Sequence, residues 1–191
     1  FNLVIQALTD PGKEVLIQTP VYHPFLSAPQ NAGAKKVEAP LKMDQNHRYS
    51  IDFDQFEDAI SENTQLFLLC NPHNPVGRVF TKDELSRMAE ICFTHDLYIC
   101  SDEIHADIVF NGFQHVPIAS LDKEIAHKTI TLMAPSKTYN IAGLGMSFAI
   151  AQNHELRDKL IQAKRGIVAH VNVLGMTAAS VAYKYGDEWL N

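Results

Sequence analysis

The sequence has few cysteines and no long hydrophobic run. Its three cysteines are odd in number and lie in apolar stretches, a pattern typical of neither a disulfide framework nor a zinc site. No apolar run approaches the roughly 20 residues that a membrane-spanning helix needs. We therefore expect neither a disulfide-stabilised secreted domain nor a membrane protein, but a cytoplasmic protein without a metal site.

Basic stretches are also absent, because acidic and basic residues are mixed along a chain whose net charge is -6. Nucleic acid is therefore not an expected partner. No Gly-x-Gly-x-x-Gly motif follows the first predicted strand, which disfavours a nucleotide-binding doubly wound domain. The sequence does not begin with Met, and residues 1–9 have the pattern of the second half of a helix. We expect that a preceding segment has been removed.

The sequence alternates short apolar runs with amphipathic segments. With 191 residues, 46% of them hydrophobic, it is long enough to bury one substantial core. Apolar runs predict strands at residues 14–18, 34–38, 66–70, 97–101, 129–133 and 146–151. Helical spacing predicts helices at residues 23–31, 53–60, 82–95, 155–166 and 173–185. The alternation indicates an α/β fold, a three-layer α/β/α domain with a mainly parallel sheet.

Two local patterns refine this prediction. Thr81 is followed three residues later by Glu84, which forms a capping box at the start of the helix at 82–95. Residues 43–50 are polar, and we expect them to form an excursion on the surface.

Three predicted strands end in polar residues with unusual chemistry. These ends are Asn71-Pro72-His73-Asn74-Pro75, Asp102-Glu103-Ile104-His105 and Ser136-Lys137. In open sheets of this class, ligands bind beyond the carboxyl ends of the strands. We therefore expect these polar groups to converge where a cofactor would lie.

Lys137, Asp102 and Asn74 together suit a pyridine aldehyde as cofactor. Such a carbonyl group needs an amine that can be neutral and nucleophilic, which a lysine in a partly desolvated pocket supplies. The pyridine nitrogen needs a carboxylate beside it, and Asp102 can fill that role while the Asn74 amide donates to a ring hydroxyl oxygen. Taken singly, each residue has an ordinary explanation: a solvated lysine, a capping aspartate and a turn-forming asparagine.

Four segments, in this order, resemble the class I/II aminotransferase-like enzymes of fold type I, which use pyridoxal 5'-phosphate (PLP). The segments are Pro20-Val21-Tyr22, Asn71-Pro72-His73-Asn74-Pro75-Val76-Gly77, Ser101-Asp102-Glu103-Ile104-His105 and Ser136-Lys137-Thr138-Tyr139-Asn140-Ile141-Ala142-Gly143-Leu144. Any one of them is weakly specific. Four in order, with 28 residues from Asn74 to Asp102 and 35 from there to Lys137, are hard to obtain by accident.

The resemblance implies a role for each candidate residue. Lys137 would be the Schiff-base lysine and later the proton shuttle at the substrate α carbon. Asp102 would pair with the pyridine nitrogen, and Asn74 would contact the 3-hydroxyl oxygen. Tyr22 would stack on the ring, and Ser136 is a candidate phosphate contact. Taken alone, Tyr22 is also explained as a packed loop residue and Ser136 as a turn serine.

Two positions depart from the pattern of many aminotransferases. Eight residues after the lysine, where many have a phosphate-binding arginine, this sequence has Gly145. Three residues after the aspartate, where many have tyrosine, it has His105. At both positions the sequence is more similar to the MalY/PatB branch, whose members are cystathionine β-lyases or related carbon-sulfur lyases. The resemblance therefore implies α,β-elimination from a sulfur-containing amino acid to pyruvate, ammonia and a thiol. We expect His105 to lie beside the cofactor or in the core.

Alternatives stay open at this point. If the two departures are neutral to reaction type, the protein is an aminotransferase that transfers an amino group to a 2-oxo acid. The fold could also be reused as a non-catalytic regulatory module. His105 and Asp107 could be metal ligands, although no third and fourth ligands stand at convincing spacing.

By the same resemblance, residues 1–191 are the central part of the PLP-binding large domain, truncated at both ends. The phosphate-binding turn, one of seven strands and the small domain with its substrate-binding arginine would lie outside the chain, and six strands should remain. We expect this fragment to bind PLP weakly. The full-length enzyme is expected to be a homodimer that acts on an amino acid as its small-molecule substrate.

Overall fold

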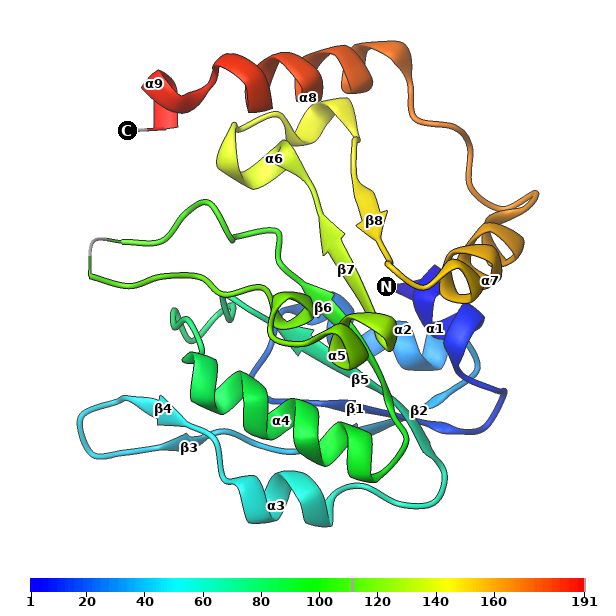
Figure 1. Ribbon diagram of the computed structural model, residues 1–191, viewed down its shortest axis with the longest axis vertical. Coiled ribbons are helices and arrows are strands. Elements are labelled where there is room, and N and C mark those ends of the chain that lie inside the picture. Colours follow the sequence, from blue (N-terminus) through cyan, green and yellow to red (C-terminus); the bar gives the residue numbers. More distant parts are fainter. Residues whose placement is uncertain (111, 191) are drawn as a thin grey trace.

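A six-stranded sheet forms the centre of the computed structural model, which describes residues 1–110 and 112–190 (Figure 1). In spatial order the strands are β2 (Lys35–Glu38), β1 (Glu14–Ile17), β5 (Thr64–Cys70), β6 (Tyr98–Asp102), β7 (Thr129–Met133) and β8 (Phe148–Ile150). Neighbouring strands are parallel except for β7 and β8, which are antiparallel. The predicted mainly parallel sheet is confirmed.

Helices cover both faces of the sheet because successive strand residues point to opposite sides. One face of the sheet, which includes Val15, Ile17 and Leu68, packs against α1 (Asn2–Leu8), α2 (His23–Asn31) and α7 (His154–Lys164). The other face, which includes Leu16, Phe67 and Leu69, packs against α3 (Phe53–Asp58), α4 (Lys82–Thr94) and α5 (Lys123–His127). The three-layer α/β/α prediction is confirmed.

A second group of elements lies beyond the carboxyl ends of the parallel strands (Figure 1). It consists of α6 (Pro135–Thr138), the 3-10 turn η2 (Ala142–Leu144), α8 (Val173–Tyr185) and α9 (Asp187–Leu190). Gly175 allows α8 to approach η2 closely, because an added Cβ atom would lie 2.6 Å from the carbonyl oxygen of Leu144. Among the described helices, none is long and apolar enough to cross a membrane.

The capping box predicted for α4 is present. The Thr81 hydroxyl accepts a hydrogen bond from the backbone N–H of Glu84 at 3.2 Å, and the Glu84 carboxylate accepts one from the N–H of Thr81 at 2.8 Å. Arg78 adds an ion pair to the same carboxylate at 2.7 Å. The start of α4 is therefore fixed by local chemistry that the sequence reveals directly.

The polar residues 43–50 lie on the surface, as predicted, where β3 (Lys42–Met43) and β4 (Tyr49–Ser50) form an antiparallel pair. The Asp44 carboxylate closes their turn by accepting hydrogen bonds from the N–H groups of Asn46 and Arg48, each at 2.8 Å. The segment between β6 and β7 contains α5 and the 3-10 turn η1 (Ile118–Ser120), which were not predicted because their apolar periodicity is too short to detect.

Phe67 offers a test of this core. Its ring is fully buried in the middle of β5 and meets Phe56 edge to face with 5.0 Å between the ring centroids. We expect Phe67→Ala to lower the free energy of unfolding by about 3–5 kcal/mol, since a large buried ring is lost and a cavity is left. Phe113→Ala is the control, because that side chain is 71% exposed. Urea unfolding that gave equal losses for the two variants would contradict the assignment of the core.

Candidate active site

A cavity of about 1040 Å³ lies at the carboxyl edge of the sheet. Its walls come from α1, from the ends of the central strands, from β8 and from the segment between α7 and α8. Five of the six predicted site residues line it, namely Tyr22, Asn74, Asp102, His105 and Lys137. Ser136 is half-buried and is not among the residues that line the cavity, so its predicted contact with a phosphate stays a prediction.

The loops that carry Tyr22 and Asn74 are tied to each other. The N–H of Tyr22 donates to the carbonyl oxygen of Asn74 at 2.9 Å, and a ring nitrogen of buried His73 lies 2.9 Å from the carbonyl oxygen of Pro20. The N–H of Asn74 also approaches the Cys70 sulfur at 3.5 Å. Tyr22 is 46% exposed and faces the cavity from the start of α2, which leaves its ring free to cover a ligand.

Asp102 ends β6 with its side chain toward the cavity and is only 9% exposed. Its carbonyl oxygen accepts a hydrogen bond from the N–H of Asn71 at 3.0 Å, and its carboxylate accepts one from the N–H of Ile104 at 3.2 Å. Burial raises the pKa of this carboxyl from its ordinary 3.8 to about 6. A cationic group beside it would favour the ionised form and lower that pKa.

Lys137 lies in the single turn of α6, and its exposed side chain lines the cavity. His105 lines the same cavity from the turn after β6. Burial lowers the pKa of His105, and the positive charge of Lys137 lowers it further. Both effects favour the neutral form of the His105 imidazole.

Glu103 is a buried carboxylate that the sequence analysis did not single out. It is 1% exposed and accepts hydrogen bonds from the Ser101 hydroxyl and from a His115 ring nitrogen, both at 2.8 Å. Successive side chains of an extended strand point to opposite faces, so Glu103 faces away from Asp102. This difference between the two carboxylates could have been predicted from the sequence. His115 lies twelve residues further along the chain, and no local pattern indicates that it reaches back.

Gly145, one of the two positions that depart from the aminotransferase pattern, has a left-handed backbone with φ 59° and ψ 44° and lines the cavity. An added Cβ atom would meet nothing within 4 Å. A side chain there would thus be disfavoured by the backbone conformation, at about 1–2 kcal/mol, rather than by lack of space. The local backbone is suited to glycine and disfavours arginine.

The alternative that His105 and Asp107 bind a metal finds no support in the described residues. No group of three or more His, Cys, Asp or Glu side chains is placed there to hold a metal ion. Asp107 instead accepts a hydrogen bond from the hydroxyl of Thr138 at 3.1 Å.

The raised pKa of Asp102 predicts a pH dependence of stability. Between about pH 4 and about pH 6 the folded chain holds a proton on Asp102 that the unfolded chain has lost, so the free energy of unfolding falls as pH rises through this interval. Asp102→Asn stays neutral and removes this contribution, roughly 3 kcal/mol across the interval. Urea unfolding of both proteins without cofactor checks it, and parallel stability curves would show that Asp102 is not desolvated.

Comparison with known proteins agrees with this geometry. The sequence matches the family described as aminotransferase class I and II over residues 2–187. It is 38% identical over 193 residues to cystathionine beta-lyase PatB of Bacillus subtilis, a match that covers 100% of this chain and 50% of PatB. It is 32% identical over 164 residues to kynurenine–oxoglutarate transaminase 3 of Rattus norvegicus, covering 82% of this chain and 36% of that protein.

Among solved structures, the fold is similar to cystalysin from Treponema denticola, which contains a pyridoxal 5'-phosphate cofactor. The TM-score is 0.95 at 40% sequence identity, and the match covers 99% of this chain and 48% of cystalysin. The chain thus spans about half the length of PatB and of cystalysin. With its parallel sheet, its strand-end cavity and the match over residues 2–187, the chain belongs to the class I and II aminotransferase family.

Proposed function

We propose that the protein containing this chain is a PLP-dependent carbon-sulfur β-lyase. It would cleave a sulfur-containing amino acid to pyruvate, ammonia and a thiol. The observation that carries the proposal is that Lys137, Asp102 and Asn74, which come from three different strand ends, line one cavity. The 38% identity to a cystathionine beta-lyase supports a lyase.

The residues of the cavity fit PLP. The exposed amine of Lys137 lies in the same cavity as the Asp102 carboxylate, which burial leaves without full solvation. A protonated ring nitrogen beside Asp102 would stabilise the ionised form of this carboxylate. Asn74 offers an amide donor, and the half-exposed Tyr22 offers an aromatic face. When bound, PLP supplies an aldehyde that condenses with amines and a ring that withdraws electrons from the substrate α carbon.

Each residue then has a defined task. The Lys137 Nζ would be the amine that attaches the cofactor and the base for the proton on the substrate α carbon. Asp102 would lie beside the ring nitrogen and favour its protonated form, and the Asn74 amide would donate to the ring hydroxyl oxygen. Tyr22 would cover the ring face, and His105, whose lowered pKa favours the neutral form, lines the same cavity as Lys137.

We further propose that residues 1–191 belong to the large, cofactor-binding domain and that the protein works as a homodimer in the cytoplasm. Several apolar side chains around α8 are strongly exposed, including Val173 at 72% and Leu174 at 70%, and such patches are typical of interfaces. The three cysteines are free and buried, which suits a reducing compartment.

An aminotransferase is the second candidate, because a kynurenine transaminase is 32% identical over 164 residues. The two activities differ in one requirement. Elimination regenerates the cofactor without a second substrate, whereas transamination needs a 2-oxo acid to accept the amino group.

Product formation separates the two candidates. We expect the full-length protein to release pyruvate from cystathionine or cysteine without added 2-oxo acid. Lys137→Ala should lower this rate by at least about 1000-fold, since both the covalent attachment and the proton transfer are lost. Lys123→Ala, an exposed lysine on α5, is the control. A strict requirement for a 2-oxo acid would overturn the lyase, and turnover by Lys137→Ala at the wild-type rate would overturn the role of Lys137.

A further inference from the structure

The sheet fixes Asp102 more directly than it fixes Lys137. The pairing of β6 with β7 ends at Asp102 and Leu132, and one further backbone hydrogen bond joins the N–H of Glu103 to the carbonyl oxygen of Leu132 at 3.0 Å. Lys137 lies five residues beyond Leu132, in a helix of a single turn. A helix this short has little stability of its own, so its orientation must come from contacts around it.

One such contact joins α6 to the turn that follows Asp102. The hydroxyl of Thr138, the residue after Lys137, donates to the Asp107 carboxylate at 3.1 Å. Thr138 is 1% exposed, so its hydroxyl has no water as an alternative partner. Within the described chain, no other hydrogen bond joins residues 103–109 to residues 134–140.

Asp107 is itself held in place. It lies within consecutive turns in which the N–H of Ala106 donates to Glu103 at 2.9 Å and the N–H of Ile108 donates to His105 at 3.0 Å. These turns continue directly from the strand end that carries Asp102. The backbone of Asp107 is therefore held by turns, and its exposed side chain is held by the hydrogen bond from Thr138.

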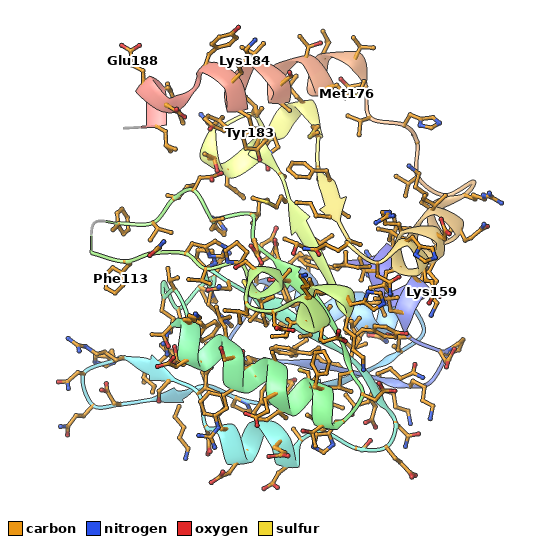
Figure 2. The ribbon with its side chains drawn as sticks, in the orientation of Figure 1. Phe113, Lys159, Met176, Tyr183, Lys184 and Glu188 are labelled. Atoms are coloured by element: carbon orange, nitrogen blue, oxygen red, sulfur yellow. The ribbon has the colours of Figure 1, made fainter. Side chains whose placement is uncertain are left out.

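The other side of α6 rests on aromatic side chains of the C-terminal helices. Tyr183, which points from α8 toward α6 in Figure 2, meets the ring of Tyr139 edge to face with 5.4 Å between centroids. The pKa values of both tyrosines are raised, first by burial and next by the negative charge of Asp107. The charge of Asp107, which accepts the hydrogen bond from Thr138, thus also acts on both tyrosines at this end of α6.

We propose that Asp107 and Thr138 are positioning residues that orient Lys137 toward the cavity. The inference rests on the proposed function, in which Lys137 is the reacting amine. A carboxylate acceptor makes a charge-assisted hydrogen bond, which is stronger and more directional than a neutral one. If it is lost, α6 rotates more freely and the Nζ atom is less often within reach of the aldehyde.

Thr138 allows a closely matched test in the full-length protein. Thr138→Val keeps the shape and removes the hydroxyl, whereas Thr138→Ser keeps the hydroxyl. Thr129→Val is the control, because Thr129 is also 1% exposed and also donates from its hydroxyl, to Ile125 at 2.7 Å, but at the far end of β7. The measurement is the rate at which added PLP forms its visible-absorbing covalent adduct with the protein, with thermal unfolding followed in parallel.

We expect Thr138→Val to slow adduct formation roughly tenfold, as loss of a hydrogen bond to a charged group predicts. Thr138→Ser should react at nearly the wild-type rate, and Thr129→Val should lose stability without losing rate. Asp107→Ala should slow the reaction to a similar extent, and the double variant with Thr138→Val should be no slower than the slower single variant, because both remove one interaction.

Other results overturn the inference. The contact does not orient Lys137 if Thr138→Val reacts as fast as the wild type and the Thr129→Val control. The same conclusion follows if Thr138→Ser reacts as slowly as Thr138→Val, or if the losses of rate multiply in the double variant. Lys137→Ala distinguishes this failure from failure of the proposed function. An adduct that still forms in Lys137→Ala places the reacting amine elsewhere, and the positioning role then falls with the role of Lys137.

Discussion

Parallel pairing of β5, β6 and β7 is the constraint on which the candidate active site depends. The register sets Cys70 beside Asp102 and Asp102 beside Leu132, so the segments that follow the three strands leave the sheet at one edge. Those segments carry Asn74, Asp102 and Lys137 to one cavity. The apolar layers on both faces stabilise this pairing. Burial of the core therefore also sets how far apart the polar groups lie.

Two adjacent carboxylates show how the same strand end serves structure and chemistry. Glu103 points away from the cavity, and its charge is stabilised by hydrogen bonds from Ser101 and His115 at 2.8 Å each. Asp102 points into the cavity, where burial raises its pKa to about 6. A buried carboxylate with partners anchors the backbone, and a desolvated one beside it is ready to bind a cation.

The sequence predicts the parts of this molecule that depend on local or periodic signals. Long apolar runs identify the central strands, and Thr81 with Glu84 marks the start of α4. The convergence of Asn74, Asp102 and Lys137 was also predictable, because carboxyl ends of parallel strands meet at one edge. Contacts between segments that are distant in the sequence were not predictable. The pairs Glu103–His115 and Asp107–Thr138 depend on how the turns beyond the sheet fold back, and no residue spacing encodes that.

The central claim is that Lys137 and Asp102 act on one cofactor in the cavity at the strand ends. A crystal structure of the full-length protein grown with PLP tests it most directly. The account predicts continuous electron density from the Lys137 Nζ atom to the cofactor, with the Asp102 carboxylate within hydrogen-bond distance of the ring nitrogen. A cofactor attached to another lysine, or a ring nitrogen that faces away from Asp102, would contradict it.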